Sequence, residues 1–302
     1  MVIQLSVSGT FSQVFTGKPR DISSDEYLAE SATPHRPVDT AAPIETVPES
    51  RKAEYIGDLA NVYGLDNSAV LPAGLSRSYG EMAARVLERC GTGAERIDLI
   101  ILAYGNTEFF VPEGAGSFLA DVFPSTKMVY AVTEQGKLAP FTALQLAKCH
   151  LYEEDFERAA VVAIEQRAVP LVDDHDASKP DCDAAAAVLA SRDIDVASDK
   201  MPSVVLRKVG GEARLGQLVR ETLSVDTLDC DPLIVIGDRI PRSEVAAISP
   251  HVQQAEPGRV CTGVWEMLDR SLRSDGKYSG PVLVVEYDPM LDQLGVASMN
   301  SR

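Results

Sequence analysis

The stretch Ile97-Asp98-Leu99-Ile100-Ile101-Leu102-Ala103-Tyr104 indicates the fold class of this 302-residue chain more clearly than any other segment. Apart from Asp98 it is a continuous apolar run, with Gly93 before it and Gly105-Asn106 after it. Such a run is typical of a central parallel strand that is buried on both faces, whereas a half-exposed strand alternates polar and apolar residues. The sequence therefore predicts a layered α/β domain that has this strand inside its sheet.

The segments on both sides of this strand alternate between helical and extended patterns. Upstream, apolar residues at three-four spacing predict a helix over about 76–89, which Ser76 or Ser78 can cap. The region of about 21–54 is rich in Pro, Ser, Thr, Ala and Glu, so we expect an irregular insertion there. The other elements predicted in this half are a strand at 2–8, a strand at 127–132, a helix at 140–151, and strands at 159–164 and 184–190.

The same kind of pattern restarts after a polar stretch at 191–202. The predicted elements are strands at 203–206, 232–236, 281–287 and 295–299, with helices at 215–223 and 259–272. The two parts share the order of their elements without sharing sequence identity. We therefore predict two α/β halves, residues 1–195 and residues 196–302.

Bulk composition narrows the class of protein. The chain is 45% hydrophobic and 24% charged, as in ordinary globular proteins, and we expect no membrane span or signal peptide. A net charge of −17 disfavours nucleic acid and anionic membranes as partners, and solubility is its simplest explanation. The five cysteines lie far apart and are odd in number, which argues against a disulfide framework and favours a reducing cytoplasm.

Several motifs resemble those of β-ketoacyl-acyl carrier protein synthase III. The run from Ile97 resembles the family's IDLIIVAT unit, residues 158–165 (RAAVVAIE) resemble RALVVGAE, and residues 183–189 (DAAAAVL) resemble DGAGAAVL. Residues 143–147 (ALQLA) resemble the helix that follows the family's nucleophile. The resemblance covers about 76–190 and resumes more weakly over 232–299. It implies a thiolase-like fold, in which two βαβαβ halves pack as αβαβα layers, and a dimer with the strand at 127–132 at the two-fold interface.

At the three positions that the same resemblance assigns to the family's catalytic Cys, His and Asn, this sequence has other residue types. The nucleophile position falls on Lys137, and no Cys or Ser lies within three residues of it. A shift of two residues would place Gln135 there, as in the chain-length-factor subunits that resemble ketosynthases. The His position falls at Gly237, the Asn position on Arg259, and the family's Gly-rich turn is replaced by residues 286–290 (EYDPM).

Two functions follow as alternatives. The first is a catalytically degenerate ketosynthase III-like subunit of acyl-thioester or specialised-metabolite biosynthesis, dimeric with itself or with an active ketosynthase. The second is an acyltransferase that uses the retained cleft without a Cys nucleophile, with Glu134, Gln135, Lys137 or Arg259 in polar roles. We expect no bound cofactor; an acyl group on coenzyme A or on acyl carrier protein would be the substrate, and acyl carrier protein a further partner.

Other reactive residues have simpler interpretations. Cys149 and His150 are adjacent on a predicted helix and point about 100° apart, so we expect Cys149 to be packed against its neighbours. Residues 173–176 (DDHD) are predicted to be a solvated loop in preference to a metal site. The charges beside Cys182 disfavour its thiolate. Arg259 could lower the pKa of Cys261, although a buried structural cysteine is the preferred interpretation.

Overall fold

The computed structural model describes residues 5–15, 57–58, 77–90, 97–106, 108, 114–153, 156–167, 180–192, 204–223, 231–274 and 280–301. The first part of the chain contains β1 (Leu5–Phe15), α3 (Tyr79–Glu88), β2 (Leu99–Ala103), α4 (Ala115–Val122), β3 (Met128–Val132), the 3₁₀ turn η3 (Gly136–Leu138), α5 (Ala139–Glu153), β4 (Arg158–Glu165) and β5 (Asp183–Arg192). The second part contains β6 (Val204–Lys208), η4 (Glu212–Arg214), α6 (Leu215–Leu223), β7 (Leu233–Ile236), α7 (Arg242–Val245), β8 (Val252–Gln254), α8 (Gly263–Ser274), β9 (Gly280–Asp288) and β10 (Gln293–Ser301).

The ten strands of the described part form two five-stranded sheets with the same internal order. The first sheet runs β3-β2-β4-β5-β1 and the second runs β8-β7-β9-β10-β6. In the first sheet β2 pairs in parallel with β3 and β4, and β5 pairs antiparallel with β4 and β1. In the second sheet β7 pairs in parallel with β8 and β9, and β10 pairs antiparallel with β9 and β6. A short parallel contact, Ser6 with Asn300 and Val7 with Ser301, joins the two sheets.

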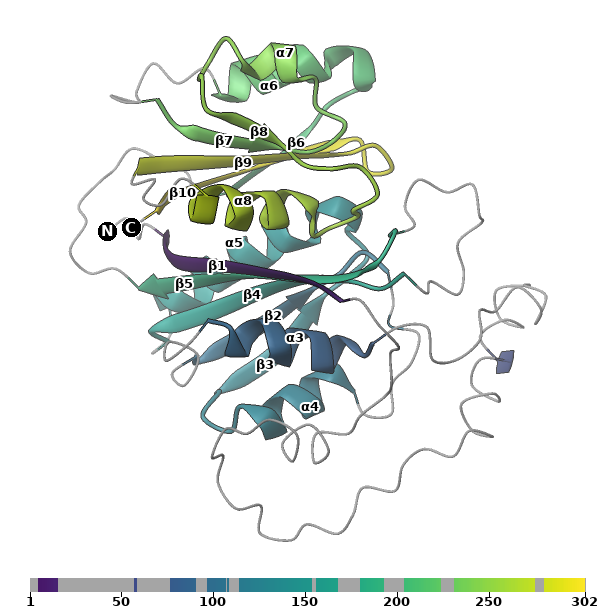
Figure 1. The fold of residues 1–302 in the computed structure, drawn as a ribbon, viewed down its shortest axis with the longest axis vertical. Helices are drawn as coiled ribbons and strands as arrows, with labels where there is room; N and C mark the ends of the chain where they lie inside the picture. Colours follow the sequence, from purple (N-terminus) through teal and green to yellow (C-terminus); the bar gives the residue numbers. More distant parts are fainter. Residues whose placement is uncertain are drawn as a thin grey trace, which may run out of the picture.

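The helices complete five layers, α-β-α-β-α, which confirms the predicted thiolase-like architecture (Figure 1). Helices α5 and α8 lie between the two sheets, α3 and α4 cover the outer face of the first sheet, and α6 and α7 cover the outer face of the second. The predicted boundary at 195/196 and the irregular insertion at 21–54 lie outside the described residues.

Strand β2 contributes side chains to two separate cores. Leu99 and Ile101 are buried in the central core with α5 and α8, and Ile100 and Leu102 are buried in the outer core with α3 and α4. Burying a side chain of this size contributes about 1.5–3 kcal/mol, so both faces of the strand stabilise the fold. The unbroken apolar run is therefore explained by helices on both sides of the sheet.

Some predicted boundaries are wrong. Strand β1 continues to Phe15 where the sequence predicted an end near Ser8, because the register against β5 shifts between Val7 and Gly9 and pairing then resumes. Helix α8 begins at Gly263 in place of 259. Helices α4 and α7 and strand β8 were not predicted, since α7 and β8 have only four and three residues and α4 has two glycines at its start.

The cap of α3 is as predicted: Ser78 is the N-cap, and its hydroxyl accepts the Glu81 N–H at 3.1 Å. Within the part of the chain that the structure describes, no helix is long and apolar enough to cross a membrane.

Candidate functional site

A pocket of about 240 Å³ lies at the carboxyl ends of the parallel strands. Its walls come from the loops after β2, β3, β7 and β9 and from the segment just before α8. Ligands of open α/β sheets bind at this end of the strands, because the loops there can vary without disturbing the core. Three of the predicted site residues line this pocket: Glu134, Lys137 and Arg259. Gly237 is adjacent to the lining residue Asp238, and Gln135 does not line the pocket.

A carboxylate of the protein occupies the start of the α5 segment. The Lys137 N–H donates to Asp288 Oδ2 at 2.8 Å, and Asp288 Oδ1 accepts the N–H groups of Met290 (2.8 Å) and Leu291 (2.9 Å). Gly136 has a φ of +47°, and a Cβ built there would lie 2.1 Å from Asp288 Oδ2. Glycine is therefore required at 136 both by its backbone conformation and by the approach of Asp288.

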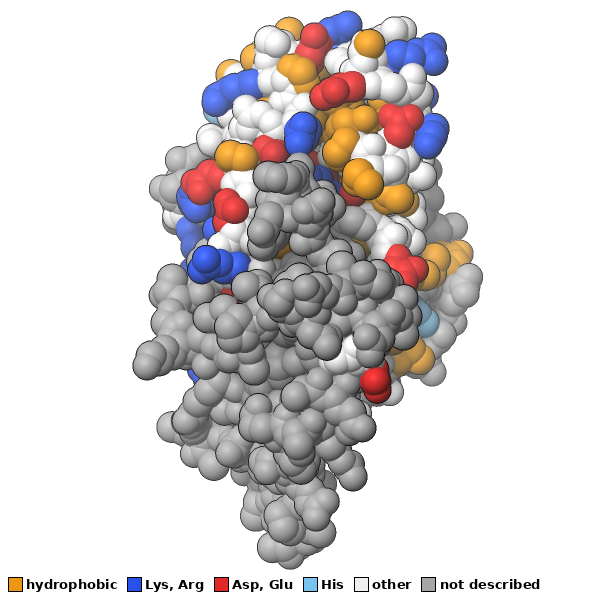
Figure 2. Space-filling model, turned by 90° about the vertical axis from the view of Figure 1, so that its right-hand side faces the viewer, with side chains coloured by type: hydrophobic (Ala, Val, Ile, Leu, Met, Phe, Trp, Pro, Cys, Tyr) orange, Lys and Arg blue, Asp and Glu red, His pale blue; other side chains and the backbone are white. Residues whose placement is uncertain are grey.

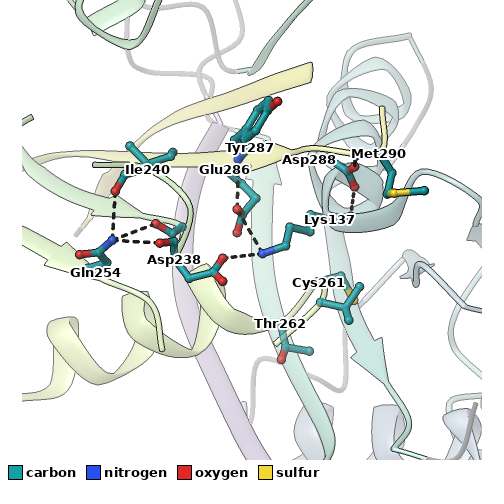
Figure 3. A network of polar contacts seen from close by, with 12 residues as sticks. Lys137, Asp238, Ile240, Gln254, Cys261, Thr262, Glu286, Tyr287, Asp288 and Met290 are labelled. Carbon is teal, nitrogen blue, oxygen red and sulfur yellow. Dashed lines mark hydrogen bonds and ion pairs between the residues drawn. The ribbon is translucent and has the colours of Figure 1, made fainter. Parts of the chain in front are cut away.

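The side chain of Lys137 is held by two further carboxyl groups (Figure 3). Its Nζ lies 2.6 Å from Asp238 Oδ1 and 3.7 Å from Glu286 Oε1, and the side chain is only 11% exposed. Burial lowers the pKa of Lys137, but the charges of Glu286 and Asp238 outweigh it, so the pKa is raised above its ordinary value. Lys137 is therefore an ammonium at neutral pH, which makes it a poor nucleophile or base.

Glu286 is a buried carboxyl group beside Lys137. Burial raises its pKa to about 7, and the attraction of Lys137 only partly opposes that rise. Its Oε1 would lie 2.1 Å from a Cβ at position 237, so Gly237 allows the Glu286 side chain to reach the site. Gln254 holds the same loop by donating from Nε2 to the carbonyls of Ile240 at 3.0 Å and Asp238 at 3.3 Å.

The start of α8 is closed by a carboxyl group in the same way. Glu165 Oε2 accepts the N–H groups of Val260 (2.8 Å) and Cys261 (2.9 Å), and the Thr262 hydroxyl lies 2.9 Å from Glu165 Oε1 and 2.5 Å from Glu266 Oε1. The Thr262 hydroxyl has one hydrogen, so it donates fully to only one of these two carboxyl groups. Burial raises the pKa of Glu165 to about 7, so Glu165 takes up a proton near neutral pH.

Arg259 is paired within the protein. Its Nε lies 3.1 Å from Glu266 Oε1 and 3.9 Å from Glu165 Oε1. Gln135 accepts a hydrogen bond from the Thr142 hydroxyl on α5. The sequence thus brought attention to 134, 135, 137, 237 and 259 but missed the carboxyl groups that pair with Lys137 and Arg259. The available signal was an acidic residue at or just beyond the carboxyl end of an apolar strand, as at Glu165, Asp238 and Asp288.

The cysteines differ in part from their predicted environments. Cys261 is buried as preferred, but burial and Glu165 raise its pKa well above the ordinary value, so the idea that Arg259 lowers it is wrong. Burial is also the largest cause that raises the pKa of Cys182 to about 11. Cys149 is exposed on α5, so its predicted packing is wrong. Residues 173–176 lie outside the described residues; elsewhere in the described part no group of side chains is arranged to hold a metal ion.

Comparison with solved structures relates this architecture to condensing enzymes. The 3-oxoacyl-(acyl carrier protein) synthase III of Pseudomonas aeruginosa superposes with a TM-score of 0.60 at 15% identity, covering 99% of this chain and 98% of that chain. The chain has the fold of a β-ketoacyl synthase III. A variant of OleA from Xanthomonas campestris (TM-score 0.57, 15% identity, 99% of both chains) has the same synthase III fold.

The priming β-ketosynthase of a polyketide biosynthetic pathway is a third match to this synthase III fold, with a TM-score of 0.60 at 17% identity over 99% of this chain and 96% of that chain. No protein-family model matches the sequence. No curated protein is significantly similar to it.

Proposed function

We propose that this chain is a catalytically degenerate synthase III-like subunit of acyl-thioester or specialised-metabolite biosynthesis, dimeric with itself or with an active ketosynthase. The observation that carries the proposal is Asp288, whose carboxylate accepts the Lys137 N–H at the start of α5. Acyl-transfer enzymes use free backbone N–H groups and helix dipoles to stabilise a developing oxyanion. Here a negative charge of the protein already lies at that donor, and it would repel such an oxyanion.

The ion pair of Lys137 supports the same proposal. An ammonium that is buried between Asp238 and Glu286 has no free electron pair, so it cannot replace a thiolate in attack on a thioester. Where a working site would have a thiolate nucleophile, this chain thus has the ion pair of Lys137 with Asp238, whose charges neutralise each other. On this proposal the subunit shapes or stabilises its dimer partner, and acyl carrier protein is a further partner of the assembly.

A second candidate is acyl transfer with repurposed residues and no Cys nucleophile. The observation that favours it is the pKa of about 7 for Glu286, since a general acid or base is most effective when its pKa is near the working pH. Acyl-coenzyme A or acyl carrier protein thioesters would be the substrates in that case.

The test is to incubate the purified full chain with acetyl-coenzyme A and malonyl-coenzyme A. We expect no turnover above a protein-free blank and no covalent mass shift on any cysteine. The chain is then co-expressed with an intact Cys-containing ketosynthase III, and native mass spectrometry checks for a mixed dimer. Thioester turnover by the chain alone, abolished by Glu286→Gln, would contradict the degenerate role and support acyl transfer.

A further inference from the structure

Among the described residues, the charged groups that line the pocket have partners within the protein, except for two of opposite sign. Lys137 is paired with Asp238, Arg259 is paired with Glu266, and Asp288 is occupied by backbone N–H groups. Glu134 and Arg239 remain, and no ion pair or hydrogen bond joins either of them to another described residue. Both side chains are exposed at the pocket.

These two residues come from different halves of the fold. Glu134 lies in the loop between β3 and η3, and Arg239 lies in the loop between β7 and α7. Among the described residues, the pocket therefore offers one unpaired anion and one unpaired cation, which come from separate loops. A ligand that carries both an ammonium and a carboxylate would satisfy both groups, whereas a ligand with a single charge would satisfy one.

The remaining wall is apolar. Val260, Pro289, Met290 and Leu291 contribute to it, and Met290 is 80% exposed, although a methionine of a folded protein is usually covered. The turn between β9 and β10 that carries Met290 projects at the right-hand edge of the fold in Figure 1. On that side of the molecule hydrophobic side chains gather among charged ones (Figure 2). A ligand with an apolar side chain would bury this surface.

The volume limits the size of the ligand. Pockets for drug-sized molecules have about 300–1,000 Å³, and this pocket has about 240 Å³. We propose that the pocket binds a free α-amino acid with an apolar side chain, with its ammonium at Glu134, its carboxylate at Arg239 and its side chain against Met290 and its neighbours. This inference does not depend on the role proposed for the subunit, because it uses neither Lys137 nor Asp288 as a reactive group.

Isothermal titration calorimetry of the full chain with L-leucine tests the proposal. Two probes lack one charge each: 4-methylpentanoate has no ammonium and 3-methylbutylamine has no carboxylate. We expect L-leucine to bind up to about fivefold more tightly than either, since an exposed ion pair contributes up to about that factor. Glu134→Gln should remove the preference over 4-methylpentanoate, and Arg239→Gln the preference over 3-methylbutylamine.

The control variants are Glu212→Gln and Arg214→Gln, which change the same residue types at exposed positions on η4, outside the pocket lining. They should bind L-leucine as the unchanged chain does. The proposal is overturned if L-leucine, L-methionine and L-phenylalanine all fail to bind at millimolar concentration, or if leucine binding is unchanged in both pocket variants. It is also overturned if S-acetylpantetheine binds in competition with leucine and more tightly, because the pocket would then fit a thioester arm.

Discussion

Lys137 places a positive charge at the position that the resemblance to synthase III assigns to the nucleophile. A thiolate at a helix start would be stabilised by the helix dipole, whereas Lys137 brings a positive charge and is neutralised by Asp238. The backbone of the same residue donates to Asp288. The position therefore binds two carboxylates of the second half, one through its side chain and one through its main chain.

We predict that Lys137→Cys will not create a reactive site. The helix dipole is equivalent to about half a positive charge, and Asp288 brings a full negative charge to the same end, so the new thiol should have a pKa above the ordinary value of about 8.5. The pH dependence of its alkylation measures this pKa. Adding Asp288→Asn should lower the pKa.

Condensation of acyl and malonyl thioesters should stay at the blank rate in Lys137→Cys, since loss of one oxyanion donor alone costs about 100–1,000-fold. Product well above the blank would contradict the prediction.

Glu165 is the residue whose protonation most clearly affects stability. Its pKa in the folded chain is about 7, above its ordinary value of 4.5. The stabilisation of the protonated form is fully present below pH 4.5 and is lost as the pH rises through about 7, at a cost on the order of 3 kcal/mol. Glu286 contributes in the same direction. Asp98 and Asp292 have lowered pKa values, so their effects on stability change at a lower pH than those of Glu165 and Glu286.

We therefore predict that Glu165→Gln reduces the pH dependence of stability. The free energy of unfolding by urea should fall between pH 5 and pH 8 in the unchanged chain and fall less in Glu165→Gln. A glutamine can still accept the N–H groups of Val260 and Cys261 through its amide oxygen. An equally steep fall in the variant would place the titration on another group.

At the scale of elements, the two central helices are capped by the opposite half of the chain. Glu165 ends β4 of the first half and binds the start of α8, while Asp288 ends β9 of the second half and binds the start of the α5 segment. The strand order β3-β2-β4-β5-β1 repeats as β8-β7-β9-β10-β6, so these two carboxyl groups lie at equivalent ends of equivalent strands. In both cases, therefore, a carboxyl group at the end of a strand in one half caps a central helix of the other half and links the two halves.

Gly136 lies directly beside the Asp288 cap, so a side chain at this position would disturb the cap. Gly136→Ala should destabilise the fold by about 2 kcal/mol, because its φ of +47° and the adjacent Asp288 oxygen both exclude a Cβ. Gly116→Ala on α4 is the control: nothing lies within 4 Å of its Cβ position, and alanine should stabilise the helix by about 0.5–1 kcal/mol. The midpoint of urea unfolding should thus fall in Gly136→Ala and rise in Gly116→Ala. Equal changes in the two midpoints would contradict the prediction.

At the scale of the whole molecule, β3 is an edge of the first sheet among the described strands, and β8 and β6 are the two edges of the second. An edge strand exposes backbone groups that can pair with another chain. Strand β3 has five residues, of which Met128 is 37% exposed. It is also the strand that the resemblance to synthase III places at a dimer interface.

We predict that the chain is a dimer through β3. Light scattering at micromolar concentration should give twice the chain mass, and Met128→Lys should reduce it toward the monomer because it places a charge on an apolar edge. Gln253→Lys on β8 is the matched control at the equivalent edge and should leave the mass unchanged. A monodisperse, soluble monomer of the unchanged chain would contradict the prediction.

The sequence by itself determined the layered α/β class and most of the elements, because apolar runs such as residues 99–103 and three-four spacing such as that of α6 are local patterns. The order of its motifs also indicated positions 137 and 259 as candidate site residues. It could not find β8 or the continuation of β1, since these are stabilised by pairing with other strands, and it could not find α7 because that helix has only four residues.

Only the tertiary structure decided what the site residues contact. Lys137 and Asp288 are 151 residues apart, and Glu165 and Val260 are 95 apart, yet hydrogen bonds join each pair. The protonation of Glu165 and Glu286 near neutral pH follows from burial, which depends on how the two halves pack together. A carboxyl group in the sequence has no fixed pKa or partner; both are set when the fold removes it from water and places it against a helix start.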